Sequence, residues 1–217
     1  MGRSSINRNA RRLVVRLASA LVLAGVLAAT GAAATPVALA ASHRQSERRA
    51  AAPAPCANAN LTPTSENIPQ IATATLCLIN RQRVLHHERP LRDNTDLDRA
   101  ATAHSEDMVA KDYFDHTSPS GDAMIDRIKA SGYLTRGYGY EVGENIECGT
   151  LWLATPASTV AAWMGSPGHR ANILNSRFVD SGIGVVAQSP AEYADNQTGA
   201  TYTQDFGSLK APNGLIS

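Results

Sequence analysis

The sequence predicts an α+β domain with a small antiparallel sheet, preceded by an export signal and a linker. Helical patterns fill the first half of the domain, and two strand-like segments, 181–187 and 201–206, follow near its end. The loop between these strands contains Pro190, Asn196 and Gly199, so we expect an antiparallel hairpin with a long connection. No internal repeat is visible, and the order of elements disfavours a doubly wound parallel sheet.

Residues 1–40 are expected to be a signal peptide. Five arginines precede an uncharged run of mostly Ala, Leu and Val over residues 17–42, and Ala38-Leu39-Ala40 fits a small-residue cleavage site. The run is also long enough to remain as an N-terminal membrane anchor, which is the alternative. Its richness in Ala, Gly and Thr favours cleavage, and therefore a secreted protein without stable membrane insertion.

The charge balance argues against a nucleic-acid-binding protein. The chain has 20 Lys and Arg against 19 Asp and Glu, but removal of residues 1–40 leaves 15 basic residues and a net charge of −4. A mildly acidic chain has no electrostatic reason to bind nucleic acid. The remaining 177 residues are enough for one domain with its own core.

The cysteines predict one disulfide. Residues 41–66 are polar, rich in Ala and Pro and without periodicity, so we expect a flexible linker that contains Cys56. A helix is expected from residue 67 to residue 85, with Cys77 pointing away from its apolar face. In an exported chain the preferred pair is Cys56–Cys77, because the N-terminal extension can reach Cys77, and Cys77–Cys148 is the alternative.

The middle of the chain predicts further helices and one short strand. A second helix, capped by Asp96, places His104 on its apolar face, where we expect a buried core histidine. A short helix is expected from residue 122 to 129 and a short strand over 141–146. The loop with Tyr133, Tyr138 and Tyr140, interleaved with glycines, is expected to be exposed and to border a groove.

Three polar side chains are the candidates for chemistry: His116, Glu144 and His169. Two imidazoles and a carboxylate can ligate a divalent metal, or act in general acid–base catalysis. Their spacings of 28 and 25 residues fix no two of them on one helix face, so loop or capping roles remain open. No G-x-S-x-G motif is present, and we interpret Ser166 as a helix cap rather than a nucleophile.

Five segments in a fixed order carry a family resemblance: 114–119, 143–146, 163–174, 182–185 and 202–207. They resemble the bacterial branch of the CAP superfamily, which comprises cysteine-rich secretory, antigen 5 and pathogenesis-related 1 proteins and whose domain is also called the SCP domain. The resemblance extends from about residue 77 to residue 207. It implies a CAP domain over residues 67–210, folded as a three-layer α-β-α sandwich around the small antiparallel sheet.

The resemblance also implies a cleft that can take a divalent cation such as Zn. Carried over residue by residue, its ligands are His116, Glu144 and His169, whereas the second acid of animal and plant members falls near Ser166. Serine is a weaker, neutral ligand, so a three-residue site completed by water is expected.

Relatives of this kind bind sterols or fatty acids, act as toxins or defence proteins, or in a few cases have been described as proteases. We therefore expect a secreted protein whose cleft binds a lipid or another small or extended ligand, with no established catalysis. The alternative is a metal-assisted hydrolase, a peptidase or esterase, in which His116 and His169 hold the ion and Glu144 is the base.

Overall fold

The computed structural model describes residues 54–212. The expected signal peptide and the first part of the expected linker lie outside the described residues. Residues 54–212 all belong to one compact unit. Within residues 54–212, no helix has both the length and the apolar character that a membrane span requires.

A four-stranded sheet forms the middle layer of the domain, with strand order β1-β3-β4-β2. The strands are β1 (Arg92–Asp93), β2 (Gly139–Thr150), β3 (Asp180–Val186) and β4 (Gly199–Lys210). β4 pairs antiparallel with both β3 and β2, which confirms the expected hairpin, and only the short β1 pairs parallel with β3. The sheet is therefore mixed but mostly antiparallel, and β2 lies at one edge.

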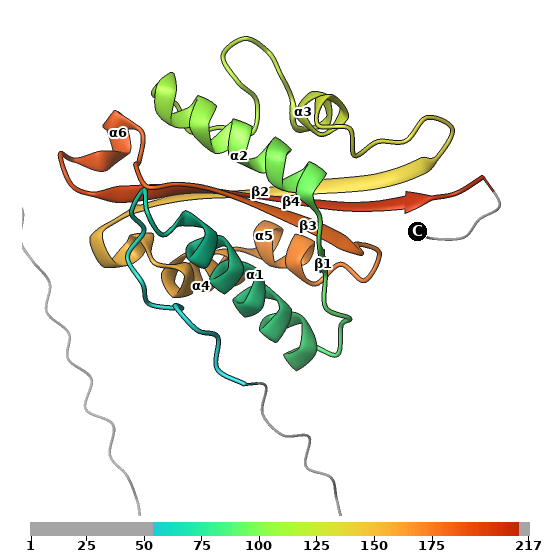
Figure 1. Cartoon of the computed structure of the whole chain (residues 1–217), viewed down its shortest axis with the longest axis horizontal. Coiled ribbons are helices and arrows are strands. Elements are labelled where there is room, and N and C mark those ends of the chain that lie inside the picture. Colours follow the sequence, from blue (N-terminus) through green and yellow to red (C-terminus); the bar gives the residue numbers. More distant parts are fainter. Residues whose placement is uncertain (1–53, 213–217) are drawn as a thin grey trace, which may run out of the picture. The chain divides into compact units, whose positions relative to one another are not determined.

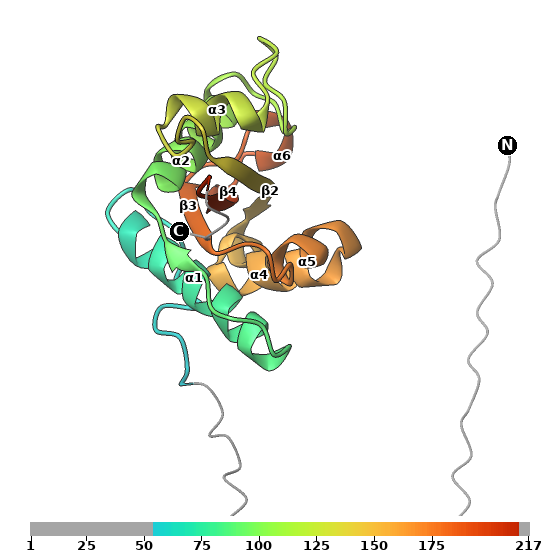
Figure 2. The ribbon, with the colours of Figure 1, turned by 90° about the vertical axis from the view of Figure 1, so that its right-hand side faces the viewer.

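Helices cover both faces of this sheet (Figure 1). One face carries α2 (Thr95–Ala110) and α3 (Met124–Ala130), and the other carries α1 (Ile68–Leu85), α4 (Pro156–Gly165) and α5 (Pro167–Ile173). Figure 2, turned by 90°, shows the two helical layers above and below the strands. The 3-10 helix η1 (Leu151–Ala154) follows β2, and α6 (Ala191–Ala194) lies in the loop between β3 and β4. The α+β, three-layer expectation is confirmed.

Large aromatic side chains fill the core between the sheet and the layer of α1, α4 and α5. Phe178 stacks on Phe206 with ring centroids 5.0 Å apart. Trp163 is fully buried, and its indole N–H donates to the Ile146 carbonyl at 3.0 Å. The Tyr202 hydroxyl donates to the Ala154 carbonyl at 2.7 Å, so the polar atoms of these buried side chains are paired.

Two glycines allow α2 to lie directly on β3. A Cβ atom at Gly182 would lie 2.1 Å from the Leu97 carbonyl carbon, and one at Gly184 would lie 2.2 Å from the Ala101 carbonyl carbon. No side chain fits in these gaps, so the glycine spacing of this strand sets the distance between helix and sheet. His104, in the next turn of α2, is thereby held fully buried.

The N-terminal segment is attached to the domain at two points. Cys56 and Cys77 form a disulfide, which confirms the preferred pairing, and Cys148 is a half-buried free cysteine. The Ala157 N–H also donates to the Ala59 carbonyl at 2.8 Å. From residue 54 onward, this part of the expected linker is therefore fixed along α1 and α4.

Some local predictions were wrong. Asn94, not Asp96, caps α2, because its side-chain oxygen accepts from the backbone N–H groups of Asp96 and Leu97 at 3.0 and 3.2 Å. Tyr133 is buried rather than exposed, with its hydroxyl bonded to Asp180. β2 is also twice as long as the expected strand, because β4 provides a pairing partner along its whole length.

Candidate functional site

The three predicted site residues come from three different elements around the edge strand β2. His116 lies in the loop between α2 and α3, Glu144 lies in β2, and His169 lies in the first turn of α5. Because β2 is the outer strand of the sheet, side chains from both helical layers can reach its edge. The topology thus explains how residues 28 and 25 positions apart come into one region.

Glu144 is the centre of the hydrogen-bond network. Its side chain is only 2% exposed. One carboxylate oxygen accepts from His116 Nδ1 at 2.8 Å, and the other accepts from Arg127 Nη2 at 2.7 Å. Arg127 also donates to the backbone carbonyls of His116 and Asp122 at 3.0 and 2.9 Å. Arg127 therefore neutralises the buried carboxylate and fixes the loop that carries His116.

These contacts lower the pKa of Glu144 and raise the pKa of His116. Burial alone would raise the pKa of Glu144, but the His116 hydrogen bond and the charge of Arg127 outweigh it and hold that pKa below its usual value. The same hydrogen bond raises the pKa of His116. About half of the His116 side chain is exposed, and because Nδ1 is used by Glu144, Nε2 is its atom for an external contact.

Two further ionisable groups lie behind Glu144. His104 Nε2 is 3.9 Å from the Glu144 carboxylate, and burial lowers the pKa of His104. Asp205 is the register partner of Glu144 in the pairing of β2 with β4 and is completely buried. Neither oxygen of Asp205 has a hydrogen-bond donor among the described residues. Burial and the neighbouring Glu144 carboxylate raise the pKa of Asp205 well above its usual range.

His169 is attached to the same strand from the opposite helical layer. The Asn145 side chain donates to the His169 carbonyl at 3.2 Å, and the Asn172 side chain donates to both Asn145 and the Glu144 carbonyl at 2.9 and 3.1 Å. Asn145 and Asn172 belong to two of the segments that carry the family resemblance, 143–146 and 163–174. Their role there is structural, because they join α5 to β2. Burial and the charge of His116 lower the pKa of His169. Its buried Nδ1 has no hydrogen-bond partner among the described residues.

Ser166 occupies the N-cap position of α5, but its side chain makes no capping hydrogen bond. The backbone alone therefore defines the helix start there, with Pro167 as its first residue, and the predicted capping bond is absent. Among residues 54–212, no serine or cysteine side chain is hydrogen-bonded to His116 or His169. The described residues thus provide neither imidazole with an aligned nucleophile.

The residues fit a metal ion only in part. An imidazole held by a carboxylate through one nitrogen, with the other nitrogen free, is the usual state of a zinc-binding histidine. However, nowhere in the described range do three His, Cys, Asp or Glu side chains converge as a metal site would require. Both oxygens of Glu144 are already used by His116 and Arg127. An ion at this site would rest on the two imidazoles, with solvent or ligand atoms completing its coordination.

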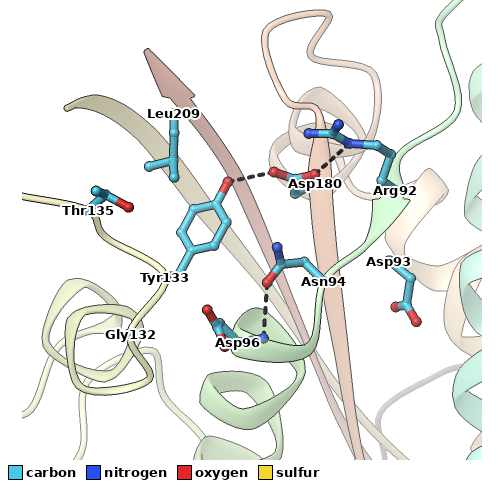
Figure 3. A pocket seen from close by; sticks show the side chains of 9 residues that line it. All are labelled: Arg92, Asp93, Asn94, Asp96, Gly132, Tyr133, Thr135, Asp180 and Leu209. Carbon is cyan, nitrogen blue, oxygen red and sulfur yellow. Dashed lines mark hydrogen bonds and ion pairs between the residues drawn. The ribbon is translucent and has the colours of Figure 1, made fainter. Parts of the chain in front are cut away.

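A separate cavity of about 480 Å³ lies at the opposite edge of the sheet, where β1 and the start of β3 meet Tyr133. Figure 3 shows Asp180 between the Tyr133 hydroxyl and the Arg92 guanidinium, at 3.0 and 2.9 Å. Asn94, in the same cavity, is used as the cap of α2. Asp180 and Asn94 are thus committed to structural hydrogen bonds, and we assign no binding role to this cavity.

Sequence reasoning missed Arg127 and Asp205 and assigned His104 to the core alone. Arg127 lies in a short helix of mixed composition, where nothing local distinguishes it from a surface residue. Asp205 carried a usable signal, since it is the one charged residue in the segment 199–209. An acid in the middle of an otherwise uncharged strand is costly to bury and so points to a partner or a function.

Comparison with known proteins identifies the relatives of this chain. The model of the cysteine-rich secretory protein family (CAP) matches residues 76–206. The chain is 35% identical over 154 residues to the protein YkwD of Bacillus subtilis, a match that covers 69% of this chain and 53% of YkwD. It is 34% identical over 110 residues to the membrane protein YlbC of the same organism, covering 51% of this chain and 30% of YlbC. The chain thus spans about half the length of YkwD.

Two solved structures resemble the domain. An extracellular protein of Bacillus anthracis that contains an SCP domain superposes with a TM-score of 0.52 at 27% identity, covering 66% of this chain and 43% of that protein. An outer surface protein of Borrelia burgdorferi superposes with a TM-score of 0.50 at 18% identity, covering 67% of this chain and 94% of that protein. The second likeness supports the fold alone.

Proposed function

Since the chain belongs to the cysteine-rich secretory protein family, we propose that it is an exported binding domain whose His116 and His169 contact a ligand at the edge of β2. The ligand that suits two imidazoles is a divalent cation such as Zn, or a molecule that brings such an ion with it. One observation carries the proposal: a buried carboxylate holds a half-exposed imidazole by Nδ1 and leaves Nε2 available.

Binding explains the site better than hydrolysis does. A general base works best when its pKa lies near the working pH, whereas the pKa of Glu144 is held below its usual value by His116 and Arg127. Both oxygens of Glu144 already accept a hydrogen bond, and its side chain is only 2% exposed, which limits the access of a water molecule to it. The Glu144 carboxylate is placed to orient the His116 imidazole. We therefore assign Glu144 a positioning role, with metal-assisted hydrolysis as the alternative to be tested.

Zinc titration by calorimetry, at pH 7.5 and pH 5.5, tests the ion-binding part of the proposal. We expect binding at pH 7.5, weaker binding in each of His116→Ala and His169→Ala, and no binding in the double variant. Because protonated imidazole cannot ligate a metal, binding at pH 5.5 should be at least tenfold weaker.

The matched control is His86→Ala combined with His87→Ala, two exposed histidines just after α1. This control variant should bind zinc as the unaltered protein does. Zinc binding that survives in the double site variant, or that depends on His86 and His87, contradicts the proposal. An unaltered protein that takes up no zinc at pH 7.5 refutes its ion-binding part.

Two further measurements address export and catalysis. Mass spectrometry of the protein recovered from the culture medium should give a chain that starts near Ala41, and a chain that retains residues 1–40 would support the anchored alternative. Peptide and ester substrates should show no turnover that depends on Glu144. Turnover that is lost in Glu144→Gln would favour the hydrolase.

A further inference from the structure

A cavity of about 550 Å³ lies between α3 and the loop that leads from this helix into β2. Its lining combines aromatic rings, aliphatic side chains and two cations, from Tyr138, Tyr140, Ile125, Leu134, Lys129 and Arg136. The two tyrosines come from the glycine-rich segment that the sequence predicts beside a groove. The cavity shares no lining residue with the His116 site.

The two cations of this cavity are unmatched. Lys129 and Arg136 are exposed, and neither forms an ion pair with a carboxylate of residues 54–212. Asp126 is the single acid among the lining residues, and one of its oxygens accepts from the Ala123 backbone N–H at 3.2 Å. The positive charges therefore favour a ligand that brings a carboxylate to the cavity.

The middle part of the β2 edge is covered by side chains. β2 is the outer strand of the sheet, on the far side of β4 from β3 (Figure 2). The Asn172 side chain donates to the Glu144 carbonyl at 3.1 Å, and the Trp163 indole donates to the Ile146 carbonyl at 3.0 Å. These bonds come from α5 and α4, and they close this part of the edge against another strand.

The first part of the same edge is open. Backbone groups of every second residue in an antiparallel strand point to the same side, so Tyr140 and Val142 direct their N–H and C=O groups outward, as Glu144 does. No residue in the range 54–212 bonds to these outward groups. Tyr140 is also 54% exposed, and it lines the cavity. The open edge and the cavity therefore adjoin at Tyr140.

An extended peptide is the ligand that fits both features. It can pair its backbone with an open strand edge and place alternate side chains in adjoining pockets. Antiparallel pairing is the more stable arrangement, and opposite residues then share one face of the sheet. On that face Val142 packs against the core cluster that contains Ile128, whereas Tyr140 borders the cavity with its two cations. An apolar residue opposite Val142 and an acid opposite Tyr140 would both meet a suitable neighbour.

We propose that β2 binds an extended acidic peptide by strand addition at Tyr140 and Val142. The peptide runs antiparallel to β2, with an apolar side chain beside Val142 and, two residues later, an acidic side chain beside Lys129 and Arg136. A peptide repeats its N–H and C=O groups with the spacing of the edge, which a sugar or a lipid chain does not. No residue of the His116 site takes part, so the peptide site stands or falls independently of ion binding.

An NMR titration of the isotope-labelled chain from residue 41 onward, the expected exported form, tests the proposal. The probe is the acetylated and amidated peptide Ser-Leu-Thr-Glu-Thr, in which Leu and Glu face the same side of an extended chain. At millimolar peptide we expect shifts in the amide signals of residues 136–142. We also expect slower hydrogen exchange of the Tyr140 and Val142 amides, because the added strand bonds to them.

Related peptides separate the parts of the interaction. The peptide Ser-Leu-Thr-Lys-Thr reverses the charge, and Ser-Leu-Glu-Thr-Thr places Leu and Glu on opposite faces. Each should bind at least about tenfold more weakly than the probe. Methylation of the backbone nitrogens of Leu and Glu in the probe removes the N–H groups that face β2, and it should abolish the slower exchange.

Variants of the protein test the cations. Lys129→Gln combined with Arg136→Gln should weaken binding of the probe roughly three- to tenfold and remove most of its salt dependence. The matched control is Arg89→Gln combined with Arg170→Gln, which makes the same change of charge at two exposed arginines outside the cavity. This control should bind the probe as the unaltered protein does.

Four results would overturn the proposal. The first is an absence of shifts at Tyr140 and Val142 at millimolar probe. The second is equal binding of the methylated or rearranged peptide, which excludes strand addition. The third is an acidic glycan, polygalacturonate, that shifts these signals when the probe does not. The fourth is a dependence of these signals on protein concentration without peptide, because a second copy of the chain would then cover the edge.

Discussion

Replacement of Arg127 by methionine tests whether the Glu144 network holds the site together. Glu144 is 2% exposed and Arg127 is 10% exposed, so both charges are largely removed from water. Removing one partner of a buried ion pair typically costs about 3–5 kcal/mol, because the other charge remains buried. Glu144 keeps its hydrogen bond from His116, so we expect a value at the lower end, about 3 kcal/mol.

The assay is urea denaturation followed by circular dichroism at pH 7 and pH 4. The lowered pKa of Glu144 means that its stabilising contribution is present above its ordinary value of 4.5 and is lost as the pH falls through the lower, folded-state pKa. The deficit of Arg127→Met should therefore be largest at pH 7 and smaller at pH 4. In an Arg127→Met/Glu144→Gln double variant, the effects should be less than additive by at least about 1.5 kcal/mol.

A surface arginine provides the matched control for this experiment. Arg177 pairs with Glu141 at 3.0 Å but is 72% exposed, so Arg177→Met should cost no more than about 0.5 kcal/mol. If Arg127→Met costs less than about 1 kcal/mol at pH 7, or no more than the Arg177 control, the network does not carry the stability that we assign to it.

Two further predictions follow from contacts described above. Because the Glu144 hydrogen bond raises the pKa of His116, the imidazole should titrate above 6.5 in an NMR pH series and return towards 6.5 in Glu144→Gln. The protonated form of His116 stabilises the fold fully below pH 6.5, and this contribution is lost as the pH rises through the raised pKa. An unchanged His116 titration in that variant would contradict this link. Gly184→Ala places a Cβ 2.2 Å from the Ala101 carbonyl carbon and should cost about 3 kcal/mol or more in thermal or urea unfolding, whereas Gly168→Ala has open space and should change stability by less than about 0.5 kcal/mol.

The sequence supports the fold more fully than it supports the site. Helical periodicity is local, so α1 and α2 could be predicted from it. The disulfide followed from the side of α1 on which Cys77 lies. Strand length depended on distant partners: β2 continues to residue 150 because β4 pairs with it throughout, and no local pattern carries that information.

The site depends on topology that single-residue patterns do not encode. Because β2 is the edge strand between two helical layers, His116 bonds to Glu144 from one side and the His169 backbone is held to Asn145 from the other. Only the family resemblance grouped the three predicted site residues in advance. Arg127 was not predictable, since its burial results from how α3 rests against Glu144. Asp205 faces Glu144 only through the register of two strands 61 residues apart.

The disulfide also determines how the domain responds to a mechanical pull. Tension applied to the N-terminal segment enters at Cys56 and passes through the sulfur atoms to Cys77, in the middle of α1. The residues between the two cysteines are bypassed. A pull therefore has to shear α1 from its neighbours as one body, instead of peeling it from its first turn. Reduction of the bond would convert shear into peeling and lower the force that the domain withstands.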